Sequence, residues 1–162
     1  MFIKKTIKKT VHIYCEGTSE KNYCEALKAN KYITKNYVLK PNSKENDLNN
    51  AILKSERLKG IGIVIIYIYD SDTFINKKKI GEAIKKKQKV IYFNEEDFED
   101  FLKCHKTKKH YHPRKPRLSR KLIEEIRNLD LDYIQTKIKK PNKFKNFKSF
   151  YDLLIELFEE RI

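Results

Sequence analysis

The chain has 162 residues, of which 40% are hydrophobic and 12% aromatic, which is enough apolar material for one α/β domain with its own core. Lys and Arg number 37 against 22 Asp and Glu, and the formal net charge of +15 favours polyanionic partners through counterion release from phosphates. A generally Lys-rich, basic proteome would explain the same charge, so net charge alone does not identify a nucleic-acid-binding protein.

Strand and helix patterns alternate through the first two thirds of the chain. A strand is read from β-rich or alternating runs, and a helix from apolar residues three and four apart after a capping residue. The predicted elements are a strand at 11–15, a helix from Ser19 to about 30, a strand at 37–39, a helix at 44–58 capped by Ser43, a strand at 61–69, a helix at 77–87, a strand at 90–93 and a helix from 95 to about 106.

The order of these elements predicts an α/β fold with a parallel, four-stranded sheet flanked by helices. The continuous β-branched run at 61–69 is typical of a central strand buried on both faces. Right-handed crossovers place the carboxyl ends of all strands at one edge, where open α/β sheets bind their ligands. Residues 1–106 are therefore predicted to form the main domain.

Residues 107–162 are predicted to be a basic extension that packs on this domain. From Phe101 to Ile123 there is no acidic residue, whereas there are nine Lys or Arg and three His. Pro113 and Pro116 predict a loop, which is followed by helices at 119–129 and 147–161. Tyr111 could add base stacking to phosphate contacts, although a solvated surface would have the same composition. The candidate nucleic-acid-binding residues are Lys108, Lys109, Arg114, Lys115, Arg117 and Arg120.

The composition predicts no membrane segment and a cytoplasmic location. The longest apolar run, at 61–69, is far shorter than the ~20 residues of a spanning helix. The basic start of the chain lacks the apolar region and cleavage site of a signal peptide. Cys15, Cys24 and Cys104 are an odd number without framework spacing, which fits a reducing compartment.

Acidic residues follow three of the predicted strands. Glu16-Gly17-x-x-Glu20 follows the first, Asp70-x-Asp72 follows the buried strand, and an acidic run that includes Glu99 follows the fourth. Carboxylates gathered at one edge suit Mg²⁺, which prefers oxygen ligands and retains waters that a substrate phosphate can replace. Each motif alone also has an ordinary structural explanation, such as helix capping or loop solvation. Their order after successive strands favours a metal site built from Glu16, Asp70 and Asp72.

This combination resembles the Toprim domain, and more closely its RloB-like branch, which is associated with phage resistance. The resemblance rests on Cys15-Glu16-Gly17-Thr18-Ser19-Glu20, on Ile66-Tyr67-Ile68-Tyr69-Asp70-Ser71-Asp72-Thr73-Phe74, and on Phe93 to Leu102, and it covers about residues 11–105. The chain departs from the family pattern at Phe93, at Glu95-Glu96-Asp97 and at Phe101. None of these departures removes a carboxylate that the pattern requires.

The resemblance implies a Mg²⁺- or Mn²⁺-dependent nuclease that cleaves DNA or RNA, with a partner ATPase of the RloA type. Asp70 and Asp72 would hold the metal, and Glu16 would be a ligand or general base. Glu99 would complete this site or a second one, and Glu20 is a further candidate. Two metals would stabilise both the entering and leaving oxygens of a phosphodiester.

Two other functions remain open for the same residues: a Toprim-like module that binds nucleic acid or an ATPase without cutting, and a phosphotransfer or nucleotide-processing enzyme. Retention of the three acids favours catalysis, because a pure binder would gain by replacing groups that repel phosphate. A soft-metal site at Cys104, His105, His110 and His112 is disfavoured, since the spacing matches no standard zinc pattern.

Overall fold

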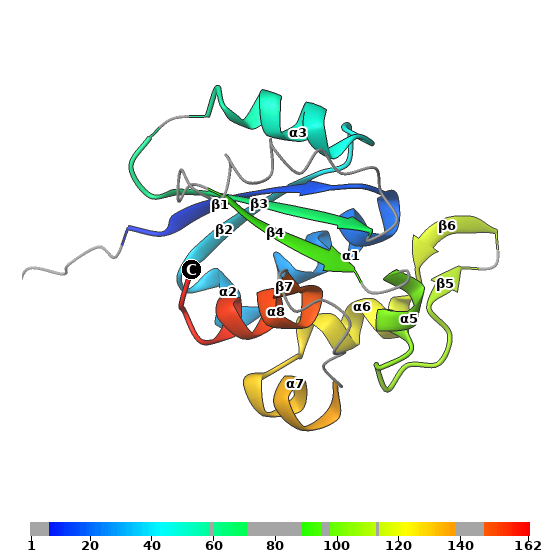
Figure 1. Ribbon diagram of the computed structural model, residues 1–162. Helices are drawn as coiled ribbons and strands as arrows, with labels where there is room; N and C mark the ends of the chain where they lie inside the picture. Colours follow the sequence, from blue (N-terminus) through cyan, green and yellow to red (C-terminus); the bar gives the residue numbers. More distant parts are fainter. Residues whose placement is uncertain (1–6, 59, 71–88, 95–97, 113, 139–147) are drawn as a thin grey trace, which may run out of the picture.

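Within the described residues, five parallel strands form the central sheet of the computed structural model, in the spatial order β2-β1-β3-β4-β7 (Figure 1). The structure describes residues 7–58, 60–70, 89–94, 98–112, 114–138 and 148–162. The strands of this sheet are Lys9–Cys15 (β1), Tyr37–Asn42 (β2), Ile63–Asp70 (β3), Lys89–Asn94 (β4) and Lys148–Ser149 (β7). The predicted α/β class is confirmed. The predicted count of four strands is wrong, because the short strand β7 pairs with β4 as a fifth.

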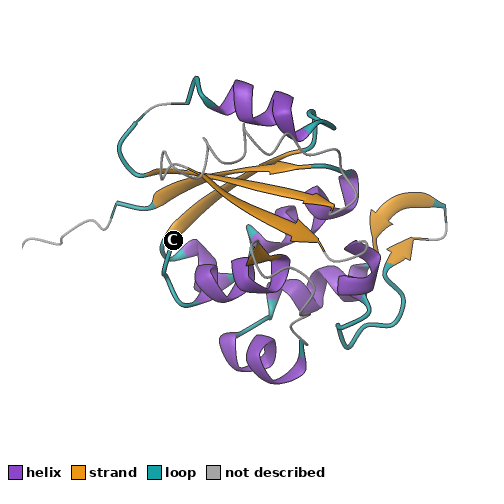
Figure 2. Cartoon of the chain, in the orientation of Figure 1, coloured by secondary structure: helices purple, strands orange, loops and turns teal. Residues whose placement is uncertain are grey.

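Helices cover both faces of the sheet (Figure 2). Helix α3 lies on one face, and α1, α2 and α8 lie on the other, with α6 beside α1. The helices described are Thr18–Leu27 (α1), Lys31–Thr34 (α2), Leu48–Ser55 (α3), Phe98–Leu102 (α5), Arg120–Arg127 (α6), Leu131–Lys137 (α7) and Phe150–Phe158 (α8). In the described parts of the chain, none of these helices has the length and apolar composition needed to cross a bilayer.

The strand β3 is buried on both faces, as its uninterrupted apolar sequence predicts. Ile66 and Ile68 belong to the larger hydrophobic cluster, which packs beneath α1 and α8, whereas Tyr67 and Tyr69 belong to a smaller cluster under α3. The strand also pairs with β1 on one side and β4 on the other. A β-branched run satisfies both conditions, since successive side chains point to opposite faces.

The C-terminal part of the chain shares the larger cluster with the first strand. Leu122 of α6 and Leu154 of α8 are fully buried in the same cluster as Val11 and Ile13 of β1. The apolar stripe predicted in the last helix is therefore core packing. Residues 107–162 thus contribute both a strand and several buried side chains to the body formed by residues 1–106.

Several helix boundaries differ from the prediction, mostly because another residue caps the helix. Gly17 precedes α1, where Ser19 was expected to be the cap, and Asp47 caps α3 in place of Ser43. Helix α7, capped by Asp130, lies between the two predicted C-terminal helices, where no helix was predicted. The helix predicted at 77–87 lies outside the described residues.

The basic loop predicted around Pro113 and Pro116 is instead an antiparallel hairpin, formed by Tyr111–His112 (β5) and Lys115–Leu118 (β6). Pro116 lies within β6, and proline is compatible with a strand whose outer edge needs no N–H donor. Figure 1 shows the hairpin at the side of the molecule toward which the β3 and β4 arrows point. The hairpin packs on α1.

Candidate active site at the carboxyl edge of the sheet

The backbones of Glu16 and Asp70 lie at the same edge of the sheet. Cys15 pairs with Ile68, and the N–H of Glu16 donates a 3.0 Å hydrogen bond to the carbonyl oxygen of Ile68. Asp70, two residues farther along β3, pairs with Asn94 at the end of β4. The ends of β1, β3 and β4 are therefore level to within about two residues.

The side chains of the predicted metal set are described only in part. Glu16 is half-buried, Asp70 is described by its backbone, and Asp72 lies outside the described residues. Among the residues whose side chains are described, no three His, Cys, Asp or Glu residues are grouped so that they could hold a metal ion. The set Glu16, Asp70 and Asp72 stays a prediction.

Glu20 lies in the first turn of α1 and is buried, with 5% of its surface exposed. A Cβ atom at Gly17 would lie 2.9 Å from the Oε2 atom of Glu20, so the carboxylate folds back over the glycine. Glutamate three residues after the cap residue commonly reaches back in this way. Gly17, with a φ of −132°, has a backbone conformation accessible to any residue. Its small size serves the close approach of Glu20.

Glu99 is linked to the start of α1 through a tyrosine from the hairpin. The Oη atom of Tyr111 lies 2.8 Å from the Oε1 atom of Glu99 and 3.1 Å from the Oγ atom of Ser19. The start of α1 thereby meets α5 and β5, which follow it by about 80 residues or more, at one phenol. Neither Ser19 nor Tyr111 was predicted to have this role, and no local pattern distinguishes them.

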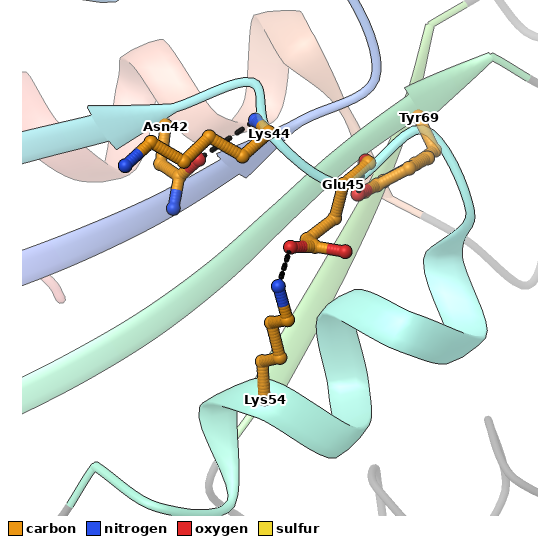
Figure 3. A network of polar contacts seen from close by, with 5 residues as sticks. All are labelled: Asn42, Lys44, Glu45, Lys54 and Tyr69. Atoms are coloured by element: carbon orange, nitrogen blue, oxygen red, sulfur yellow. Dashed lines mark hydrogen bonds and ion pairs between the residues drawn. The ribbon is translucent and has the colours of Figure 1, made fainter.

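A polar network on the face covered by α3 holds the carboxyl end of β3 in place (Figure 3). The hydroxyl of Tyr69 donates a 2.6 Å hydrogen bond to the carbonyl oxygen of Glu45, whose carboxylate pairs with Lys54. Burial, and then the nearby Cys15, Glu16 and Glu45, raise the pKa of Tyr69, which is therefore a neutral donor at neutral pH. This bond fixes the loop between β2 and α3 against the residue that precedes Asp70.

Most of the candidate nucleic-acid-binding cations are exposed around the hairpin. Lys108, Lys109, Arg114, Arg117 and Arg120 have exposed side chains, and Lys115 is placed by its backbone in β6. The segment is fixed at both ends. The N–H of Thr107 donates to Glu125 at 2.8 Å, and the N–H of Ser119 donates to the carbonyl oxygen of His110 at 2.6 Å.

The cysteine and histidine residues near this segment have separate environments. His105 is buried, and its Nε2 atom lies 2.6 Å from the hydroxyl of Tyr23, within a cluster of aromatic rings. Burial lowers the pKa of His105, so the ring is neutral at neutral pH. The Nδ1 atom of His112 accepts a 3.2 Å hydrogen bond from the N–H of Arg114 at the tip of the hairpin.

The position of the acidic and basic groups suggests what the edge can do chemically. The acidic residue directly after β1 and acidic residues of α1 and α5 lie near the strand ends, and exposed cations lie on the adjacent hairpin. Such an arrangement suits a phosphate ester whose backbone is held by cations beside a carboxylate site. Comparison of the chain with protein-family models, with curated proteins and with solved structures gives no match.

Proposed function

We propose that the chain is a Mg²⁺- or Mn²⁺-dependent nuclease of the Toprim type, which cleaves phosphodiester bonds of DNA or RNA. The single observation that carries this proposal is the common level of the strand ends. Glu16 follows β1 while its N–H still bonds to Ile68 of β3, and β3 ends with Asp70 at the same edge. Open α/β sheets bind their ligands at this edge.

The proposed metal ligands are Glu16, Asp70 and Asp72. Their carboxylate oxygens match the preference of Mg²⁺ for hard oxygen donors, so the donor chemistry fits the ion. When bound, the cation would offset the negative charge that develops on a phosphodiester undergoing hydrolysis. Glu20 and Glu99 are proposed as further acidic groups of the site.

The hairpin and the cysteines support the proposed substrate and compartment. The exposed cations on and beside β5 and β6 would hold the phosphate backbone next to the acidic edge. All three cysteines are free thiols, which agrees with the proposed location in a reducing cytoplasm. A role in phage defence with a partner ATPase follows from the family resemblance.

The test is cleavage by the purified chain and by an Asp70→Asn variant. Supercoiled DNA and a long RNA would each be incubated with Mg²⁺, Mn²⁺ or EDTA. We expect metal-dependent cleavage by the wild-type chain, and a loss of at least about 100-fold in the variant, because a nearly isosteric amide lacks the charge that a hard cation requires. An unchanged thermal unfolding midpoint would show that the variant is folded.

Asp132→Asn provides the matched control, because Asp132 is exposed on α7, away from the strand ends. This variant should cleave at the wild-type rate. Full activity of a folded Asp70→Asn protein would refute the assigned site. Binding of nucleic acid by the wild-type chain without cleavage in any metal would instead support the non-catalytic module.

A further inference from the structure

Tyr111 connects the basic hairpin to the acidic edge of the sheet. A phenol carries one proton, and the geometry places the carboxylate of Glu99 2.8 Å from the Tyr111 oxygen and the hydroxyl of Ser19 at 3.1 Å. A carboxylate only accepts hydrogen bonds, so Tyr111 donates to Glu99, and its oxygen accepts from Ser19. One hydroxyl therefore joins β5 to both α5 and the first turn of α1.

The rest of the hairpin has one attached end and one exposed end. Tyr111 pairs with Leu118, which is 2% exposed and belongs to the larger hydrophobic cluster, and the ring of Tyr111 packs against this cluster. The side chains of Arg114, near the turn, and of Arg117, next to Leu118 in β6, are exposed. The attachment of Tyr111 and Leu118 thus determines where the two arginines lie relative to the strand ends.

We propose that Tyr111 is a positioning residue. It holds the cationic hairpin beside the acidic edge of the sheet, so that the hairpin binds the phosphate backbone of a nucleic acid there. This inference rests on the proposed function for the identity of the ligand. The ring of Tyr111 is engaged with the core, so the hairpin acts through its charges, and the base stacking considered for Tyr111 is not part of this role.

The chemistry of the phenol agrees with positioning and not with acid–base catalysis. Burial raises the pKa of Tyr111 to about 12; the hydrogen bond with Ser19 acts in the opposite direction, and the hydrogen bond to Glu99 raises the pKa further. The hydroxyl remains protonated at neutral pH and keeps the proton that it donates to Glu99.

Tyr111→Phe removes this hydroxyl and leaves the ring. Tyr37→Phe is the matched control, because the hydroxyl of Tyr37 in β2 also makes a tertiary hydrogen bond, to the carbonyl oxygen of Ile162 at 3.3 Å, away from the hairpin and its anchors. Native-state hydrogen exchange would follow the amides of residues 111–118. We expect exchange about tenfold faster in Tyr111→Phe, since the lost bond involves a charged acceptor, and no change at these amides in Tyr37→Phe.

The second measurement is the affinity for a fluorescent 20-base-pair DNA duplex in EDTA, as a function of salt. In Tyr111→Phe we expect binding about 3- to 10-fold weaker with an unchanged salt slope, because every cation is still present but the hairpin is less ordered before binding. Tyr37→Phe should bind like the wild type. A purely stabilising role of Tyr111 would lower the unfolding midpoint without changing the affinity of the folded protein.

The outcomes separate this proposal from the nuclease proposal. Unchanged hairpin exchange or unchanged affinity in Tyr111→Phe would overturn the positioning role, as would a wild-type chain that does not bind the duplex. Faster exchange with weaker binding, combined with no cleavage by the wild type in any metal, would support positioning while refuting the nuclease.

Discussion

At the scale of single residues, polar side chains such as that of Glu125 form hydrogen bonds between separate segments of the chain. The carboxylate of Glu125 in α6 accepts hydrogen bonds from the backbone N–H groups of Lys106 and Thr107, from the Thr107 hydroxyl and from Tyr133. These donors lie on the segment after α5 and on α7. Although burial acts in the opposite direction, hydrogen bonds from Thr107, Tyr133 and the backbone lower the pKa of Glu125.

Glu125→Gln should reduce the free energy of unfolding at neutral pH by about 1–2 kcal/mol, since charged hydrogen bonds are replaced by weaker ones. The pKa of Glu125 is lower in the folded than in the unfolded state. Its charge therefore stabilises the fold above the unfolded-state pKa, and this contribution is lost as the pH falls through the folded-state pKa.

The measurement is urea unfolding at several pH values between 3 and 7, with Glu124→Gln as the control. Glu124 is the neighbouring residue, but it is exposed, and its variant should resemble the wild type throughout. A stability difference for Glu125→Gln that does not shrink on acidification would contradict the assigned charge state.

At the scale of elements, the hairpin of β5 and β6 is a feature that the sequence prediction described incorrectly. Two prolines and many cations indicated a loop, but the pairing of Tyr111 with Leu118 and of His112 with Lys115 makes a ribbon. The buried side chain of Leu118 provides the packing that a loop would lack. Tertiary contact with α1 thus outweighs the local preference of proline-rich sequence for loops.

Reversal of three hairpin charges, Arg114→Glu, Lys115→Glu and Arg117→Glu, should weaken nucleic-acid binding and reduce its salt slope by about one for each phosphate contact that is lost. Stability should change by no more than about 0.5 kcal/mol for each exposed position. Fluorescence anisotropy at several salt concentrations would measure both affinity and slope.

The control reverses three exposed lysines, Lys28, Lys31 and Lys35, near α2 at the opposite edge of the sheet. It changes the net charge equally but should retain most of the affinity and the slope. Equal losses in the two triple variants would mean that binding depends on overall charge and not on the hairpin.

At the scale of the whole molecule, one hydrophobic cluster joins the two parts of the chain that the sequence suggested. Leu122 in α6 is fully buried together with Tyr23 and Leu27 of α1 and Val11 of β1. Strand β7 also extends the sheet formed by the first four strands. The C-terminal residues therefore complete the core and would unfold together with it.

Leu122→Ala should lower the free energy of unfolding by about 2–5 kcal/mol, because it removes buried methyl groups and leaves a cavity. Leu53→Ala, a control in α3 where the side chain is 48% exposed, should cost far less. Circular dichroism and tyrosine fluorescence should report a single coincident transition in both variants. Two separate transitions would indicate that residues 107–162 unfold independently.

Periodicity and strand-forming runs determined the α/β class, the order of the first four strands along the chain, and the apolar face of the last helix. These features depend on local patterning, which is readable because burial of one face repeats at 3.6 or 2 residues. The same patterns placed Glu16 and Asp70 at the ends of strands. Parallel pairing of β1 with β3 then brings these two strand ends together at one edge of the sheet.

Only the tertiary structure decided the fifth strand, the hairpin and the link from Ser19 through Tyr111 to Glu99. Strand β7 is two residues long, and β5 is equally short, so neither carries a periodic signal. Their pairing depends on partners more than 50 residues away in one case and on packing against α1 in the other. Hydrogen bonds between remote side chains follow from where the elements pack, and composition or spacing does not encode them locally.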